Sequence, residues 1–271
     1  MVDKKINFKD SFNIEDKINP LSNGPKGTRI IFIDDETGKP YREEQNKQVI
    51  AGSQLTAMRQ FGLDRLVKFP NYNHELGIDH TDLGIDDNDI ACLFCCGNGG
   101  CGNEPDQVYP VNFAGRIHPS NIIPFRYQKD DDDLTPQQRE IYFGRKEIPE
   151  DNRIAYYYKI FDSEPQMHLN FIDGTQINSD IYEIATSMRA VCYVETKIKI
   201  TKSDLRDFYL VKDKLSNARI NQISLLTAHV EEGEDGFKYY KNPTPLTQLN
   251  FTNEWLTDLT KSITILYQVF Y

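Results

Sequence analysis

Residues 191–200 alternate between two kinds of side chain, and this alternation constrains the fold more than any other feature of the sequence. One face carries small or apolar side chains, namely Cys192, Val194, Thr196, Ile198 and Ile200. The other face carries Tyr193, Glu195, Lys197 and Lys199. A period of two residues fits a half-buried strand and does not fit a helix, whose period is about 3.6 residues. The sequence therefore predicts a β-strand at Val191–Ile200.

Other segments have the β-branched and aromatic composition of strands. They are Arg29–Asp34, Asp89–Phe94, Gln107–Phe113, Asn121–Tyr127, Arg153–Phe161, Gln166–Ile172, Ile220–Val230 and Ser262–Tyr271. Prolines in or beside the third and fourth of these argue against a central position in a sheet. The pair Asp173-Gly174 predicts a tight hairpin turn. Several short strands separated by turns predict a mainly β protein, a β-sandwich or barrel-like fold of antiparallel sheets.

Two short helices complete the expected fold. The first spans Ser53–Phe61, with Ser53 as its N-cap, an apolar face that includes Leu55, Met58 and Phe61, and Gly62 as its stop. A single helical turn is expected at Ser203–Tyr209.

The second helix is expected at Leu134–Phe143. Thr135 is its predicted N-cap, Pro136 occupies the first helical position, and Gln138 completes a capping box. Gly144 is expected to end this helix.

Four regions follow from these elements. Residues 1–28 have little hydrophobic periodicity and form an extended N-terminal arm, whose removal is expected to leave the fold intact and to impair assembly. Residues 29–128 form a mixed region that contains a Cys/Gly turn, and residues 129–152 a charged loop with a short helix. Residues 153–271 form a C-terminal antiparallel β domain.

Composition excludes some classes of function. The 271 residues include 31 Lys and Arg against 41 Asp and Glu, so the formal net charge is −10. A chain this acidic is poorly suited to bind nucleic acid directly or to dock on an anionic membrane. The polar N-terminus contains no secretory signal, and no apolar run is long enough to span a bilayer, so we expect a protein made in a cytoplasm.

The sharpest local motif is Cys92-x2-Cys95-Cys96-x4-Cys101. Thiolates at this spacing could hold zinc tetrahedrally, alone or together with His118 or His74. Buried structural thiols in a reducing compartment are the alternative, and a single CxxC favours it. A Cys96–Cys101 disulfide is sterically possible but disfavoured in a cytosol.

Other motifs are weaker. Residues 97–102 match G-x-G-x-x-G, but the following Glu-Pro sequence leaves no room for the helix that would bind a dinucleotide, so a tight surface turn is expected. The histidines His74 and His80 do not have zincin spacing, and Asp79–Asp89 lacks the pattern of a calcium loop and is expected to be a solvated acidic loop. No nucleophile elbow or P-loop is present. An enzyme would therefore need a site assembled from dispersed residues such as His118, His168 and His229.

Aromatic residues are abundant, with 15 Tyr and 15 Phe. In Tyr156-Tyr157-Tyr158 both faces of a predicted strand carry a ring. Such rings fill a core or meet another subunit, because aromatic side chains are enriched at interface centres. The C-terminal strand is aromatic to its last residue, so we expect it to be paired inside a sheet or against a neighbour.

Several segments together resemble virion structural proteins of tailed bacteriophages. These are Asn121–Arg126, Arg153–Asp162, the hairpin at Asp173-Gly174, Thr196–Tyr209, Ile220–Val230 and Leu259–Tyr271. The resemblance covers mainly residues 121–271 and lies in the style and order of elements. It implies a neck, tail, baseplate or head-to-tail component that is made in the host cytoplasm and located in the virion. It implies contacts with other virion proteins, a homo-oligomer, and neither catalytic residues nor a resident cofactor.

The sequence thus predicts a non-enzymatic structural subunit of a tailed-phage virion. The alternative is a zinc-stabilised cytoplasmic protein-binding module centred on the turn from Cys92 to Cys101, which predicts stoichiometric zinc. A third possibility is an enzyme with a site of dispersed residues, which predicts a pocket with perturbed titratable groups.

Overall fold

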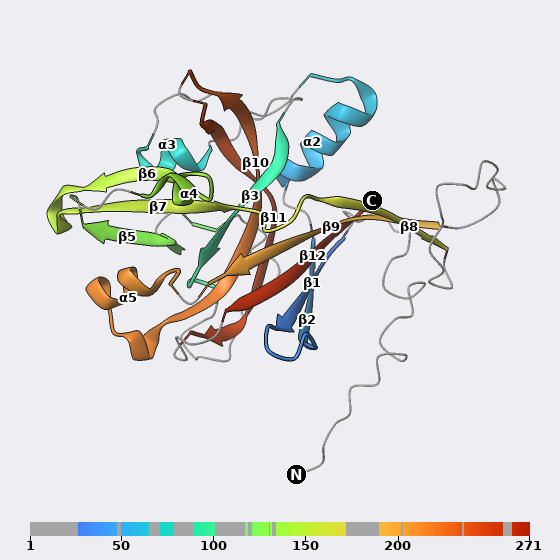
Figure 1. Cartoon of the computed structure of the whole chain (residues 1–271). Coiled ribbons are helices and arrows are strands. Elements are labelled where there is room, and N and C mark those ends of the chain that lie inside the picture. The colour runs from blue at the N-terminus through green and yellow to red at the C-terminus, as the bar shows by residue number, and fades with distance from the viewer. Residues whose placement is uncertain are drawn as a thin grey trace, which may run out of the picture.

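Two antiparallel sheets packed face to face make up most of the molecule in the computed structural model (Figure 1). The structure describes residues 27–47, 50–64, 71–78, 89–100, 117–118, 121–129, 131, 134–171, 190–201, 203–234, 236–256 and 262–271. Within them the predicted mainly β, sandwich-like class is confirmed.

Sheet A has the strand order β2-β1-β12-β9-β8. Its strands are β1 (Gly27–Asp34), β2 (Pro40–Lys47), β8 (Gln166–Phe171), β9 (Ala190–Ile200) and β12 (Ile263–Phe270). The predicted alternation along β9 is confirmed in its second half, where Thr196, Ile198 and Ile200 are buried and both isoleucines belong to the core between the sheets.

Sheet B follows the order β11-β10-β3-β7-β5, with β4 paired to β3 and β6 paired to β7. Its strands are β3 (Ile90–Gly97), β4 (Ile122–Ile123), β5 (Arg126–Lys129), β6 (Tyr142–Ile148), β7 (Arg153–Ile160), β10 (Arg219–Glu232) and β11 (Lys238–Trp255). Both sheets combine strands from residues 29–128 with strands from residues 153–271.

The main core fills the space between the sheets. Sheet A contributes Ile30, Phe32, Ile198, Ile265 and Tyr267, and sheet B contributes Phe94, Cys96, Ile223, Leu249 and Phe251, all buried. Apolar burial of this kind contributes about 25 cal/mol per Å² removed from water. Because these core residues come from strands near both ends of the described chain, the stability of the sandwich depends on segments that are far apart in the sequence.

Arg42 lies on β2 of sheet A, and its side chain contacts both sheets at the side of the sandwich formed by β2 and β11. Its guanidinium carbon lies 5.3 Å from the Phe32 ring centroid on β1 and 5.2 Å from the Phe251 ring centroid on β11. Its Nη1 donates to the carbonyl oxygen of Thr252 at 3.1 Å. The charged side chain thus covers the edge of the aromatic core while its head forms hydrogen bonds.

The first predicted helix is present but differs in its bounds. Helix α2 (Ile50–Phe61) begins three residues before Ser53, so Ser53 is not its N-cap. Gly62 follows it at φ 60, as a helix stop requires. Of the predicted apolar face, Leu55 and Met58 are buried, whereas Phe61 is 72% exposed.

The second predicted helix, Leu134–Phe143, is much shorter than expected. Helix α4 spans only Pro136–Arg139, with the predicted N-cap at Thr135 and the predicted capping box. The chain then enters β6 at Tyr142, where Gly144 has φ 70 and lies inside the strand. An added Cβ at Gly144 would lie 2.4 Å from the Tyr158 ring, so the glycine is required by close packing and does not end a helix.

Two other helices are short. Helix α3 (Tyr72–Leu76) is capped by Asn71. Helix α5 (Arg206–Lys212) begins later than the predicted turn at Ser203–Tyr209. No helix in the described part of the chain is long and apolar enough to cross a membrane.

Strand β11 is the longest strand in the described chain that the sequence did not predict. Its centre contains Asn242, Pro243 and Pro245, which argue against a strand. Proline is tolerated here because β11 is at the edge of sheet B, and its register with β10 shifts near these residues.

Some predictions fall outside the described residues. These are the arm up to residue 26, the strand Gln107–Phe113 and the hairpin turn Asp173-Gly174. Residues 27 and 28, assigned to the arm, belong to β1. The predicted strand Asn121–Tyr127 is divided into β4 and β5, neither of which is central.

Candidate functional site

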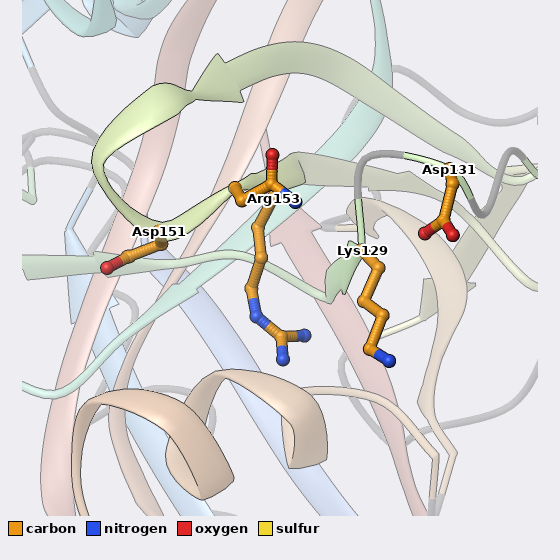
Figure 2. Close-up of a pocket in the computed structure, with 5 residues that line it drawn as sticks. Lys129, Asp131, Asp151 and Arg153 are labelled. Carbon is orange, nitrogen blue, oxygen red and sulfur yellow. The ribbon is translucent and has the colours of Figure 1, made fainter.

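An open pocket of about 680 Å³ lies beside helix α5, at the start of β7. It is lined by Lys129, Asp131, Asp151, Asn152 and Arg153. Figure 2 shows the side chains of Lys129 and Arg153 reaching in the same direction, toward a helix below them. This is the candidate binding site that the described residues offer.

The register of sheet B places two cations together in this pocket. Lys129 on β5 pairs with Arg153 on β7 in an antiparallel ladder. Arg153 Nη1 donates to the carbonyl oxygen of Tyr127 at 2.9 Å, and its guanidinium carbon lies 5.7 Å from the Tyr127 ring centroid. The guanidinium is therefore held in place, while the Lys129 side chain is exposed.

A tight turn supplies Asp151, one of the two carboxylates that line the pocket; the other is Asp131. The 3-10 helix η2 (Pro149–Asp151) ends at Asn152, which has φ 53, and this turn connects β6 to β7. The Asp151 carboxylate accepts hydrogen bonds from the Tyr127 hydroxyl and is paired with the Lys212 ammonium of α5. The site thus joins β5, the β6–β7 turn and α5.

Asp151 and Tyr127 shift each other's pKa through their hydrogen bond. Hydrogen bonding from Lys212, and then from Tyr127, lowers the pKa of Asp151 below its ordinary value. Burial, and then the hydrogen bond to Asp151, raises the pKa of Tyr127 above its ordinary value. Near neutral pH the carboxylate stays ionised and the phenol stays protonated, so neither group is poised to exchange a proton. The pocket can attract an acidic group through Lys129 and Arg153.

The sequence predicts only a charged loop at residues 129–133 and does not predict this pocket. A signal was available in Pro149-Glu150-Asp151-Asn152, which has turn composition and lies between two apolar runs. The partners of Asp151 on β5 and α5 could not be identified, because they lie 24 and 61 positions away along the chain.

The predicted zinc ligands Cys92, Cys95 and Cys96 all lie on β3. Cys95 and Cys96 are buried on opposite faces of this strand. Cys96 belongs to the main core, and Cys95 belongs to a second cluster with Leu93 and Tyr158. The register with β10 shifts opposite Cys92, and this bulge packs Cys92 against the cluster that contains Cys95.

The environment of these thiols is apolar. Burial raises the pKa of Cys92 to about 12 and raises the pKa of Cys95 and Cys96 well above the ordinary value. A zinc ligand must be a thiolate, which this environment disfavours. Among the described residues, no group of three or more His, Cys, Asp or Glu side chains is placed to hold a metal ion. Cys101 lies outside the described residues, so the four-cysteine site stays a prediction.

The histidines predicted as further ligands lie elsewhere in the fold. His74 is exposed on α3, and His118 precedes β4, where its carbonyl oxygen accepts from Asn121 N at 2.8 Å. His168 stacks on Tyr193 in sheet A, and His229 lies on β10 in sheet B. These two histidines therefore lie on strands of different sheets.

The predicted acidic loop ends in a buried residue. Residues 79–88 lie outside the described part, but Asp89 is fully buried. Its Oδ1 lies 3.7 Å from Nδ1 of His229. The expectation of a solvated side chain is therefore wrong at Asp89, because β3 begins directly after it and carries it into the sheet.

The glycine-rich turn after β3 is held by carboxamide side chains. Gly100 N donates to Oδ1 of Asn221 at 2.7 Å, and Gly99 N donates to Oε1 of Gln222 at 3.1 Å. A Cβ on Gly100 would lie 2.4 Å from the Asn221 carbonyl oxygen. The described residues 97–100 are buried or half-buried against β10, so this part of the predicted surface turn does not lie on the surface. Its amide donors are used within the protein, so the visible part of the G-x-G-x-x-G motif offers no phosphate cradle.

Large apolar side chains are exposed at several separate places. They include Met167 on β8 at 75%, Phe61 and Leu63 at the end of α2 at 72% and 61%, and Leu210 on α5 at 51%. Neighbouring exposed apolar residues are typical of surfaces that contact other proteins.

Comparison with known proteins adds no relative. No protein-family profile, curated protein or solved structure matches this chain.

Proposed function

We propose that the protein is a non-enzymatic structural subunit of a tailed-phage virion, in the neck, tail, baseplate or head-to-tail connection. It acts through contacts with other virion proteins and with further copies of itself. The exposed apolar side chains are the observation that carries this proposal: Met167, Phe61 with Leu63, and Leu210 with Val211 lie on separate elements. A subunit that contacts several neighbours needs several such places.

The pocket beside α5 fits the same role. Lys129 and Arg153 can attract a carboxylate of a neighbouring protein, while Asp151 is held by its own partners. Ion pairs at such a position contribute more to orientation and partner choice than to affinity. The buried thiols of β3 support a structural role for the cysteines.

The experiment is proteomic analysis of particles from the producing source, purified by density gradient. A structural subunit co-sediments with the major capsid and tail proteins through successive gradients. Abundance in producing cells combined with absence from the purified particles would contradict the proposal.

A further inference from the structure

The two outer strands of sheet A differ sharply in charge. Strand β2, at one edge, has the sequence PYREEQNK, with four charged residues and a leading proline. Strand β8, at the other edge, has the sequence QMHLNF and contains no Lys, Arg, Asp or Glu. The contrast lies within one sheet, so the composition of the chain as a whole does not explain it.

Charge and proline are the usual protection of an edge strand. An outer strand presents unpaired N–H and C=O groups, and charged side chains or proline prevent another strand from pairing with it. Strand β2 has both kinds of protection. Strand β8 has neither, and in the described part of the chain it pairs only with β9. An unprotected edge is a site for strand addition.

Strand β8 also extends beyond the centre of the sheet. Its ladder with β9 continues to Phe171 opposite Ala190, whereas the ladder of β12 with β9 stops at Phe270 opposite Tyr193. Past that point a single bond, from Tyr271 N to the Cys192 carbonyl oxygen at 3.0 Å, joins the end of β12 to β9. Figure 1 shows β8 and the start of β9 reaching away from the body of the sandwich. A two-stranded ribbon is marginally stable alone, so another strand would stabilise it.

Ring contacts hold β8 in place beside β9, which leaves its outer edge in the conformation of a strand. The His168 ring stacks on Tyr193 with centroids 4.9 Å apart, and Tyr193 contacts Phe270 at 5.2 Å. This row of rings crosses β8, β9 and β12 and fixes the ribbon on one face of the sheet. Met167, on the other face of β8, is 75% exposed.

We propose that β8 pairs antiparallel with β8 of a second copy of this chain around a two-fold axis, joining two sheets A edge to edge. The charge distribution argues for a second copy as the occupant. Two chains of net charge −10 repel one another, so copies can approach most closely where neither carries charge, and the β8 edge places no like charges opposite each other. A two-fold axis uses the same strand on both copies, as an isologous contact requires.

This inference rests on the proposed structural role and has a separate test. Sedimentation equilibrium of the full chain measures the dimer dissociation constant for the wild type, Met167→Lys and the matched control Ile90→Lys. Ile90 is an apolar residue that is 52% exposed at the start of β3 in sheet B, away from the β8 edge of sheet A. We expect a reversible dimer that Met167→Lys weakens at least about tenfold and Ile90→Lys leaves unchanged, because a lysine at position 167 of each copy restores the missing edge charge.

Hydrogen exchange gives a second readout that does not depend on a variant. Raising the wild-type concentration is expected to slow exchange in residues 166–171 and to leave residues 40–47 of the protected edge unchanged. A wild type that stays monomeric would overturn the inference. So would a dimer whose dissociation constant is unchanged by Met167→Lys and whose formation does not slow exchange in residues 166–171. Presence of the protein in purified particles would still support the structural role in that case, so the two proposals fail separately.

Discussion

The Nζ of Lys159 lies 2.8 Å from Oδ2 of Asp204, and both side chains are buried between the two sheets. Lys159 also donates to the carbonyl oxygen of Lys199 on β9 at 2.7 Å. Asp204 accepts from the Tyr142 hydroxyl at 2.6 Å and from Thr201 N at 2.8 Å. The pair therefore joins β7 of sheet B to β9 of sheet A and to the loop before α5.

Replacing Asp204 with Asn should strongly destabilise the fold. The change leaves the buried Lys159 ammonium without its counter-charge, which typically costs about 3–5 kcal/mol. Chemical denaturation measures the change in the free energy of unfolding. The control is Asp162→Asn, because Asp162 forms an exposed pair with Lys197 at 3.7 Å, and such pairs contribute about 0–1 kcal/mol. Similar losses from both variants would show that the buried pair has no special role.

Gly144→Ala should destabilise more than Gly38→Ala. Both glycines have positive φ, 70 and 66, so both variants carry similar backbone strain. Only at Gly144 would the new Cβ lie 2.4 Å from the Tyr158 ring, while nothing lies within 4 Å at Gly38. Overpacking adds about 1–3 kcal/mol, so the difference between the two unfolding free energies should fall in that range. Equal losses would mean that backbone strain alone accounts for the effect.

The thiols of β3 should resist alkylation in the native protein. A pKa of about 12 leaves about one Cys92 thiol in ten thousand ionised at pH 8, and Cys95 and Cys96 are fully buried. Peptide mapping after iodoacetamide treatment should find these three residues unmodified until denaturant is added. Rapid native labelling would contradict the structure. Stoichiometric zinc that protects the same cysteines, and whose removal by a chelator lowers stability, would instead support the zinc-stabilised alternative.

Acid should weaken the contact between the β6–β7 turn and α5. The pKa of Asp151 is lowered by Lys212 and Tyr127 in the folded protein, so the unfolded chain binds a proton at higher pH than the folded one. The resulting stabilisation is present above the ordinary aspartate pKa and is lost as pH falls through the folded value. Unfolding curves of the wild type and Asp151→Asn should therefore differ at neutral pH and converge in acid. A constant difference across this pH range would contradict the linkage.

The class of fold could be predicted from the alternation along β9 and from the apolar runs of β1, β10 and β12. These patterns involve only residues that are close together in the sequence. The long strand β11 was missed because Pro243 and Pro245 argue against a strand unless its position at a sheet edge is known. Gly144 was misread for a related reason. Its contact is with Tyr158 on the neighbouring strand, which no local pattern reveals.

The candidate sites were less predictable than the fold. The cysteine spacing indicated a motif but did not show that β3 would bury Cys95 and Cys96 on opposite faces. The pocket depends on contacts among β5, the β6–β7 turn and α5, which only the folded chain brings together. The sequence shows that β8 is an uncharged strand, but it does not show that β8 lies beside β9 at the edge of sheet A.

The most direct test of the structural role is the absolute copy number of this protein per purified particle, by quantitative mass spectrometry against the major capsid protein. We predict a fixed copy number that is the same in independent preparations and persists after repeated gradients. A value that varies between preparations or falls toward zero with purification would contradict the claim that the chain is a structural subunit.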